Sequence, residues 1–598
     1  MAVAWIFVVS LLTIASVAPA HLNADVLINS VMSLQHVTLY YWGQNRLLNV
    51  LPALISMVGN PAANLAAVLL CATLSFFALV YLICRSVVSL AGAARLELST
   101  LRLFVFLSSA LLLTFRPAAI FEMSIGHIEY SLAAALLVFS FYILALRRHE
   151  GGIAASLAIS AIFLAVGLNP STVIPAVFLS VVAFAYKRKV IIPEAVLGGG
   201  ALIAFLFWSY ISSHYEGPSY KEFSPAILLA GLDRVIAGLI GTLDAVWLLV
   251  FAGGVVVARF SLLVLVGSAP AVDAFAYSRN AVVVFSIVWL LLFSSSAWVQ
   301  ANEFSWRYFI YILFAGVFSF ATCCEDFLRR VPVILSLLVV LVTASMAVAK
   351  MATPVLEFRD YAVFKAADEQ APVGGEFYAG DYWVVWPAVL REMLHGNMAY
   401  GLAYRGSGNA AEVRHHMFER ISTSGHASVY CINDTVENCR AQIGGVAGAL
   451  PIDAVVPVSK SVHELRLVAE LSYRDKRFTE LPAQVGVRKE GYSESVGQPG
   501  FMLFGPYATL PAGRYRLSLF GQSDFADGAY LDVVSQQGTR VYAKHYLREA
   551  AGGTLLHDVT VDIPENVSDL EVRVWVGERS RVRLSGYGFD RLRTAKGD

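Results

Sequence analysis

Charged residues are scarce in this sequence: Asp, Glu, Lys and Arg together make up 15% of its 598 residues, compared with about 25% in an average soluble domain. The formal net charge is zero and no basic stripe is present, so nucleic acid is not an expected partner. The six cysteines include no CxxC pair and no Cys/His cluster, so structural zinc is not expected either. These absences point away from nucleic-acid-binding and zinc-stabilised proteins.

Hydrophobic residues take the place of the missing charges, since they make up 57% of the chain and the mean hydropathy is +0.63. They are concentrated in residues 1–350, where apolar runs are separated by short polar links, whereas residues 351–598 read as an ordinary soluble sequence. Because a helix needs roughly 20 apolar residues to cross a bilayer, we predict a mainly α membrane bundle of about eleven transmembrane helices. The predicted spans are 3–20, 61–84, 103–120, 131–146, 153–169, 172–186, 192–211, 241–258, 280–298, 307–322 and 332–349.

Three segments are ambiguous. Residues 261–271 are apolar but too short to cross alone, and we interpret them as part of a cytoplasmic link or a re-entrant piece. Residues 225–239 carry Asp233 and Arg234 within an apolar pattern, which favours an interfacial amphipathic helix. Residues 1–20 end in Ala-Pro-Ala, like a signal-peptide cleavage site, but the basic n-region is missing, which favours an uncleaved first span.

Lysine and arginine residues gather in alternate links between the predicted spans, and the side that collects them is expected to be cytoplasmic. These cations are Arg85, Arg95, Arg102, Arg147, Arg148, Lys187, Arg188, Lys189, Arg259, Arg279, Arg329 and Arg330. The opposite side is then expected to hold 21–60, 119–130, the turn at 169–170, 212–240, 299–306 and everything after residue 350.

The soluble part divides at about residue 485 into two predicted domains, 351–485 and 486–598. The first mixes strand-like and helix-like runs, which predicts a small α/β domain. The second alternates short strands with Gly, Pro and Asp turns, which is typical of a β-sandwich. Its segment 505–515 resembles the opening of carbohydrate-binding-module-like sandwiches, and a purely structural or interaction role fits it equally well.

The soluble part contains two cysteines, Cys431 and Cys439, with seven residues between them. In an oxidising compartment this pair would close a small loop as a disulfide. We favour the disulfide over the alternative of two unrelated thiols.

Three predicted outer links contain more ionisable and amide groups than loops of their length need. Their candidate residues are Asp25, Tyr41, Trp42, Gln44 and Arg46 in the first link, Arg116, His127 and Glu129 in the second, and Glu303 and Arg307 in the third. All three links are expected on the same side of the membrane, where the helix ends can converge. The sequence therefore predicts one outward-facing cavity lined by carboxylates, a histidine, guanidinium groups and aromatic rings.

Each of these residue types has a task in the transfer of a sugar from a lipid phosphate. A carboxylate within hydrogen-bond reach of a hydroxyl can remove its proton as the hydroxyl attacks. Arginine holds a phosphate in bidentate geometry and stabilises the charge that grows on a phosphate leaving group. Tyrosine and tryptophan present flat faces to sugar rings and also suit the water–lipid boundary where an isoprenoid chain would enter.

Simpler interpretations stay open for most of these residues. The loop aromatics could form only the interfacial belt. His127 and Glu129 could bind a metal, although their alternation on a short loop is weak support, and Glu129 could instead neutralise Arg116. Asp25 and Arg307 are the strongest candidates, because an ionisable group at the mouth of a membrane domain is costly and is by default a functional-site candidate.

The segments Asn23-Ala-Asp25 and Tyr41-Trp42-Gly43-Gln44-Asn45-Arg46 are similar to loops in bacterial GT-C glycosyltransferases. An acidic residue just after the first span, a long first outer loop with an interfacial helix and an outer C-terminal domain also resemble this superfamily. The resemblance implies a polyprenyl-phosphate-sugar donor used on the outer membrane face. It therefore implies a multi-pass protein of the bacterial inner membrane with a periplasmic C-terminal domain.

The resemblance also implies roles for the candidate residues. Asp25 would be the catalytic base, and Arg307, Arg46 and Arg116 would bind the donor phosphate. The implied substrate-binding residues are Gln44, Tyr41, Trp42, His127, Glu129 and Glu303. No cofactor is expected: the commoner family pattern has two adjacent acids in the first loop, whereas residues 24 and 26 are Ala and Val here, so a divalent metal is not favoured.

The sequence thus predicts an inverting transfer of a hexose or pentose to a glycan, lipid or pilin-type protein acceptor. The sandwich looks like the appended carbohydrate-binding domains of arabinosyltransferases and would position the acceptor. Two other classes stay open. A lipid-linked sugar flippase or transporter predicts internal repeats and charges midway along spans, and a non-catalytic membrane scaffold predicts polysaccharide binding by the sandwich alone. An O-antigen polymerase or ligase is a closer alternative, but it usually lacks so large a C-terminal domain.

Overall fold

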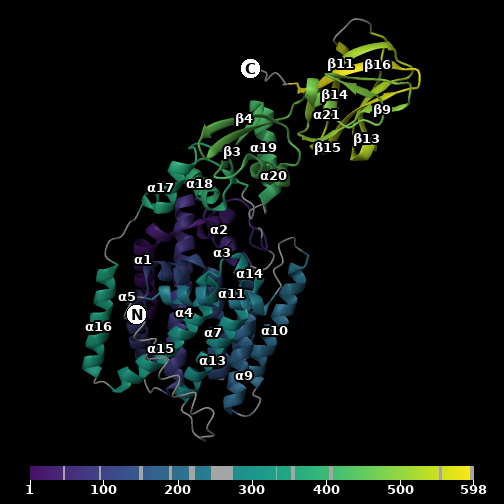
Figure 1. Cartoon of the computed structure of the whole chain (residues 1–598). Coiled ribbons are helices and arrows are strands. Elements are labelled where there is room, and N and C mark those ends of the chain that lie inside the picture. The colour runs from purple at the N-terminus through teal and green to yellow at the C-terminus, as the bar shows by residue number, and fades with distance from the viewer. Residues whose placement is uncertain are drawn as a thin grey trace. The chain divides into compact units, whose positions relative to one another are not determined.

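The chain forms two compact units in the computed structural model, Met1–Ala367 and Asp368–Asp598. The first unit is a bundle of helices, and the second combines helices with three sheets (Figure 1). The structure describes residues 1–592 except 43, 45–47, 93–95, 147–151, 188–191, 215–222, 244–273, 331–332, 352–356, 403–408 and 551–554.

The first unit consists of long apolar helices joined by short helical turns. Its α-helices are α1 (Ala2–His21), α2 (Ala24–Leu34), α3 (Val50–Ile55), α4 (Pro61–Leu90), α5 (Leu96–Thr114), α6 (Pro117–Phe121), α7 (Ile128–Phe141), α8 (Gly152–Leu168), α9 (Val173–Lys187), α10 (Ile192–Ser212), α11 (Pro225–Gly241), α13 (Ala274–Ser294), α14 (Ala297–Ala301), α15 (Ile310–Arg330) and α16 (Val333–Lys350), followed by α17 (Ala362–Gln370). Short π and 3-10 turns are η1 (Glu122–Gly126), η2 (Tyr142–Leu146), η3 (Pro170–Thr172), η4 (Trp306–Phe309) and η5 (Phe358–Asp360). In Figure 1, α9 and α10 run side by side at one edge of this bundle and α16 runs at the opposite edge.

Seven helices in the described part of the chain are long and apolar enough to cross a membrane. By length and composition, the first unit is therefore that of a multi-pass membrane protein. The predicted spans 153–169 and 172–186 are present as the shorter apolar helices α8 and α9. The predicted span 241–258 and the ambiguous segment 261–271 lie outside the described residues.

The predicted span 103–120 is wrong at its end, because α5 stops at Thr114. Pro117 occupies the first position of the next helix, α6, where its missing N–H is tolerated. The segments Pro117–Gly126 and Ile128–Leu144 together pass as one further span, although they meet at an angle of 69°. The chain therefore bends in the middle of the second candidate link, and the bend matters for the site described below.

Helix α2 is fixed to α4 by a buried polar cluster. The side chain of Asn64 on α4 accepts hydrogen bonds from the hydroxyls of Ser30 and Ser33 on α2, at 2.7 and 2.9 Å. Asn23 caps the start of α2, where its side-chain oxygen accepts from the backbone N–H of Val26 at 3.3 Å. These bonds fix the direction in which the first turn of α2 presents its side chains.

The ambiguous segment 225–239 forms helix α11, and its Asp233 and Arg234 are exposed. Two glycines of α11, seven residues apart, lie against aromatic side chains of the segment that leads to α15. A Cβ at Gly231 would lie 2.0 Å from the ring of Phe304. Glycine is therefore required where α11 packs on this segment.

The first part of the second unit is a five-stranded sheet in the order β2-β1-β3-β5-β4. Its strands are β1 (Phe377–Gly380), β2 (Tyr400–Gly401), β3 (His426–Ile432), β4 (Ile452–Ser459) and β5 (Val462–Val468), with helices α18 (Tyr382–Leu394), α19 (Ala410–Ser424) and α20 (Val436–Ala447). Strands β2, β1 and β3 are parallel, whereas β5 and β4 add antiparallel pairs. This mixed sheet with helices is the predicted small α/β arrangement.

Two further sheets follow, and alternate residues of both face one buried core. One has the order β14-β11-β16-β8-β7 with β6 also paired to β16, and the other has the order β10-β15-β12-β13 with β9 also paired to β15. Their elements are β6 (Leu471–Arg474), α21 (Asp475–Glu480), β7 (Val487–Lys489), β8 (Tyr492–Glu494), β9 (Gly500–Leu503), β10 (Pro506–Leu510), β11 (Gly513–Phe525), β12 (Tyr530–Ser535), η7 (Gln536–Gly538), β13 (Arg540–Tyr546), β14 (Leu555–Ile563), β15 (Val567–Val576) and β16 (Arg581–Arg591). The sandwich thus begins with β6, before the predicted boundary at residue 486, because β6 pairs with β16.

Cys431 on β3 and Cys439 on α20 are joined by a disulfide, with their Cα atoms 5.8 Å apart. Both side chains are fully buried. We expect the double substitution Cys431→Ser/Cys439→Ser to lower the free energy of unfolding of the second unit by about 2–3 kcal/mol, because it releases a short closed loop in the unfolded chain. Thermal unfolding with and without reductant measures this effect.

Reductant should lower the melting temperature of the wild type and leave the melting temperature of the double variant unchanged. Cys71→Ser, at a free thiol on α4, serves as the control. A wild type that is insensitive to reductant after unfolding and refolding would contradict this expectation.

Candidate active site

Asp25 and Arg307 lie together although 282 residues separate them in the sequence. Asp25 is in the first turn of α2, where a negative charge is favoured by the helix dipole. Arg307 is in η4, immediately before α15. Its Nη1 donates to Oδ2 of Asp25 at 3.4 Å, and the two side chains are 19% and 27% exposed. The pair is therefore partly buried, and each charge has a partner.

Arg307 keeps donor capacity beyond this pair. Its Nη2 donates to the hydroxyl of Tyr308 at 3.1 Å, and its guanidinium carbon lies 5.2 Å from the centre of the Tyr308 ring. Its Nε is buried and has no hydrogen-bond partner among the described residues. A buried donor without a partner is costly, and an anionic group of a ligand would satisfy it.

His127 lies between two carboxylates at the bend between α6 and α7. Its Nδ1 is 3.0 Å from Oε1 of Glu129, and its Nε2 is 3.1 Å from Oε2 of Glu122. The contact with Glu129 is a hydrogen bond, whereas that with Glu122 is an ion pair without hydrogen-bond alignment. Two carboxylates around one imidazole favour its doubly protonated, positively charged form.

The π turn η1 creates this arrangement. It spans Glu122–Gly126 and adds a residue to the helical turn, so that the side chain of Glu122 lies next to that of His127. Gly126 leaves room for the carboxylate, since a Cβ there would lie 2.7 Å from Oε2 of Glu122. Helix α2, which carries Asp25, lies against the π turn η1, which begins at Glu122. The two ion-paired groups therefore belong to one polar cluster.

The structure brings four of the predicted site residues into this cluster: Asp25, Arg307, His127 and Glu129. Sequence reasoning missed Glu122 and Tyr308. Glu122 is the first residue of the π turn and Tyr308 follows Arg307 directly, but neither position stands out in the sequence.

The other predicted residues have varied surroundings. Tyr41 donates its hydroxyl to the backbone oxygen of Asp25 at 3.2 Å, and so supports the first turn of α2. Trp42 is buried and Gln44 is partly buried. Arg116 and Glu303 are exposed, and no side-chain contact to the cluster is present for either in the described part of the chain. Arg46 lies outside the described residues.

The alternative that Glu129 only neutralises Arg116 is not what the structure shows, since Glu129 pairs with His127. The alternative of a metal held by His127 and Glu129 has no structural support in these contacts, because each ring nitrogen of His127 faces a carboxylate. Across the described residues, no group of three or more His, Cys, Asp or Glu side chains is arranged to hold a metal ion.

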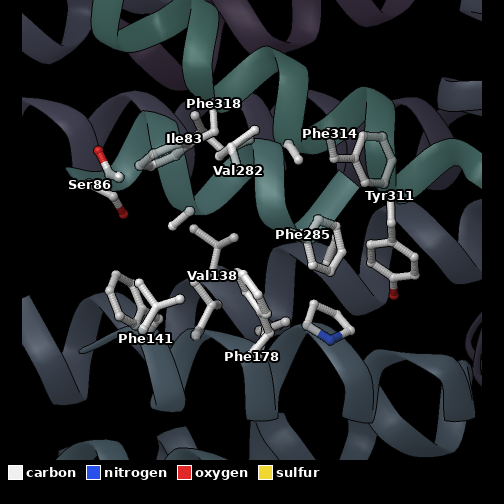
Figure 2. Close-up of a pocket in the computed structure, with 18 of the residues that line it drawn as sticks. Ile83, Ser86, Val138, Phe141, Phe178, Val282, Phe285, Tyr311, Phe314 and Phe318 are labelled. Carbon is white, nitrogen blue, oxygen red and sulfur yellow. The ribbon is translucent and has the colours of Figure 1, made fainter. Parts of the chain in front are cut away.

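An apolar cavity of about 270 Å³ lies between α4, α7, α9, α13 and α15. Rings of Phe141, Phe178, Phe285 and Phe314 surround it (Figure 2). Tyr311 lies at one end of the view and also lines the cavity. The size and apolar lining suit a hydrocarbon chain.

A short series of aromatic contacts connects this cavity to the polar cluster. The ring of Tyr311 is 5.6 Å from that of Tyr130, which is 5.7 Å from the ring of His127. The hydroxyl of Tyr311 is 2.6 Å from that of Thr172. A ligand with a polar head and an apolar tail therefore finds complementary surfaces within one region of the first unit.

No protein-family model matches the chain, and no curated protein matches it. Among solved structures, ArnT from Cupriavidus metallidurans in the apo state is similar over 78% of this chain and 97% of its own, at 12% identity and a TM-score of 0.40. Arabinosyltransferase EmbB from Mycobacterium smegmatis is similar over 99% of this chain, which spans 64% of the EmbB chain, at 10% identity and a TM-score of 0.30. Both TM-scores lie below 0.5, so neither likeness by itself assigns an activity to this chain.

We expect Glu122→Gln to lower the free energy of unfolding of the detergent-purified protein by about 1–3 kcal/mol, because a partly buried His127 then loses one of its charged partners. The melting temperature, followed by tryptophan fluorescence, measures the change. Glu303→Gln, at an exposed glutamate, should leave the melting temperature unchanged. Equal melting temperatures for Glu122→Gln and the wild type would show that the contact at 3.1 Å contributes nothing to stability.

Proposed function

We propose that the chain is a GT-C-type membrane glycosyltransferase that moves one sugar from a polyprenyl phosphate to an acceptor hydroxyl outside the cytoplasm. The observation that carries this proposal is the contact between Asp25 and Arg307 beside further ionisable groups. A carboxylate that can accept a proton and a guanidinium that can bind a phosphate are the two groups that such a transfer needs.

In the proposed reaction, Asp25 removes the proton of the acceptor hydroxyl. The hydroxyl oxygen forms a bond to the anomeric carbon while the bond from that carbon to the phosphate oxygen breaks. The electron pair of the broken bond leaves with the polyprenyl phosphate. Attack opposite the leaving group inverts the anomeric centre. Arg307 stabilises the negative charge on the departing phosphate, using the donor that has no partner in the described structure.

Arg307 would exchange its long contact with Asp25 for the phosphate when the donor binds. A distance of 3.4 Å is at the weak end for a hydrogen bond, so the exchange costs little. Donor binding would at the same time release the carboxylate to act as a base. The pair thus supports both roles, one after the other: Arg307 binds the phosphate, and Asp25 is then free to remove the proton.

The cluster of His127, Glu122 and Glu129 would contact the hydroxyls of the donor sugar or of the acceptor. Carboxylates accept hydrogen bonds from hydroxyls, and several such bonds fix the position of a sugar ring.

The apolar cavity would hold the first part of the polyprenyl chain, and its aromatic connection to His127 supports a lipid-linked donor. The acceptor would be a glycan, a lipid or a pilin-type protein. We further propose a location in the bacterial inner membrane, with the soluble unit in the periplasm, from the alternation of cationic links in the sequence.

Asp25→Asn should lower the rate of sugar transfer by roughly 10²–10⁴-fold, which is the usual contribution of a general base. The assay uses purified protein in membranes supplied with polyprenyl-phosphate sugars and follows transfer to acceptor. Asp233→Asn, at an exposed carboxylate on α11, is the matched control and should retain wild-type activity. Wild-type rates for a folded Asp25→Asn variant would remove the proposed base, and movement of the sugar lipid across the membrane without transfer would favour a flippase.

Ala281→Phe should raise the KM for a long-chain donor, because the new ring fills part of the apolar cavity that Ala281 lines. The KM for a donor with only two isoprene units should change little. Val284→Phe is the control, since Val284 is on the same helix but is 41% exposed. If both donors were affected equally, or neither, the prenyl chain would not occupy this cavity.

A further inference from the structure

The short segment between α14 and η4 leads directly to Arg307 and has a strained backbone. Glu303 and Phe304 follow one another with φ angles of 57° and 56°. Successive non-glycine residues in the left-handed region are uncommon and cost free energy. The backbone N–H groups of both residues donate to oxygens of α14, at 2.9 Å each. Such strain persists only where the surrounding structure fixes the backbone, so the segment before Arg307 is held in place by its neighbours.

Helix α11 supplies the surface on which this segment rests. Phe304 is 6% exposed, and a Cβ at Gly231 would lie 2.0 Å from the Cε1 of its ring. About two turns further along α11, a Cβ at Gly238 would lie 3.1 Å from the Cβ of Trp306. Side chains approach a helix this closely only where the helix residue has no Cβ. The two aromatic residues that precede Arg307 therefore fit against two glycines of one helix.

Both ends of α11 are attached to segments that lead to the candidate active site. At its start, the N–H of Ser224 donates to the backbone oxygen of Ser295 at 2.9 Å, in the link between α13 and α14. At its other end, the N–H of Arg116 donates to the backbone oxygen of Thr242 at 3.2 Å. Arg116 lies in the link between α5 and α6, which continues into η1 and Glu122. Helix α11 is thus fixed relative to both links.

The residue that follows Arg307 is fixed as well. The indole N–H of Trp289 on α13 donates to the backbone oxygen of Tyr308 at 3.3 Å. The ring of Trp298 on α14 meets that of Tyr308 edge to face, with ring centres 6.2 Å apart. Arg307 therefore lies between two neighbours whose positions are set by other helices, and the place of its guanidinium depends on theirs.

We propose that Gly231, Phe304 and Trp306 are positioning residues for Arg307, which they hold where its guanidinium meets the donor phosphate. The inference rests on the proposed function, because it assigns to these contacts a role in that reaction. Stability alone gives no reason to keep a strained backbone here, whereas a fixed guanidinium does. A displaced phosphate-binding group is costly, since a misplacement of about 1 Å can lower a rate by about 10²-fold.

The test makes the same substitution at three glycines of α11 and follows transfer from a polyprenyl-phosphate sugar. Gly231→Ala adds a Cβ where the ring of Phe304 lies, and it should lower kcat/KM for the donor by roughly 10²-fold. Gly238→Ala meets only the milder contact with Trp306 and should have a smaller effect in the same direction. Gly241→Ala is the matched control, because no described atom lies within 4 Å of the added Cβ, and it should retain wild-type kinetics.

Two readouts separate positioning from stability. Gly231→Ala should change kcat and the KM for the donor but not the KM for the acceptor, because Arg307 binds the donor phosphate. Gly231→Ala/Phe304→Leu removes ring atoms from the crowded place, and it should raise kcat/KM by roughly tenfold above that of Gly231→Ala. A purely structural role would lower the melting temperature and leave the kinetics of the folded molecules unchanged. Gly238→Ala carries the same comparison if Gly231→Ala does not fold.

Arg307→Ala distinguishes failure of this inference from failure of the proposed function. If Arg307→Ala is inactive while the folded glycine variants behave as the wild type, the positioning role is overturned and the proposed function stands. Equal losses in Gly231→Ala and Gly241→Ala, or no recovery in the double variant, also overturn the positioning role alone. If the wild type transfers no sugar, or if Arg307→Ala transfers it at the wild-type rate, both are overturned.

Discussion

Charge pairing in an apolar surrounding is the constraint on which the first unit depends. Asp25 lies against Arg307, and His127 lies between Glu122 and Glu129. An ionised side chain that is partly buried without a partner costs several kcal/mol. Because Asp25 and Arg307 come from different segments, their pair fixes the start of α2 relative to the turn before α15, whereas the pairs of His127 stabilise the bend before α7 itself. A shift of α2 or of the turn before α15 would leave a charge without its partner.

The polar cluster and the apolar cavity are connected within the first unit. Tyr130 and Tyr311 connect them, and their rings make the change from charged to hydrocarbon surroundings gradual. Such a region suits an amphiphile whose reactive group sits at the boundary between its head and its tail.

Sequence reasoning found Asp25 and Arg307 because each is an ionisable residue next to an apolar helix. It also placed most of the helices and strands, since hydrophobic runs and alternation depend on local periodicity. It missed Glu122, because the π turn that directs this side chain toward His127 has no clear sequence signal. It also included Arg116 and Glu303 among the candidate site residues, although both side chains are exposed. Residue type alone does not tell whether a loop side chain points into a site or into solvent.

The sequence by itself determined that the chain has a helical, membrane-type part followed by an α/β and a β-sandwich part, because composition and periodicity are properties of neighbouring residues. Only the tertiary structure decided that Asp25 meets Arg307 across 282 residues. It alone also decided that Phe501, Trp575, Tyr530 and Tyr546 lie opposite one another on neighbouring strands of the sandwich. Helix packing and strand register arise from contacts between segments that are far apart along the chain, and no local pattern encodes them.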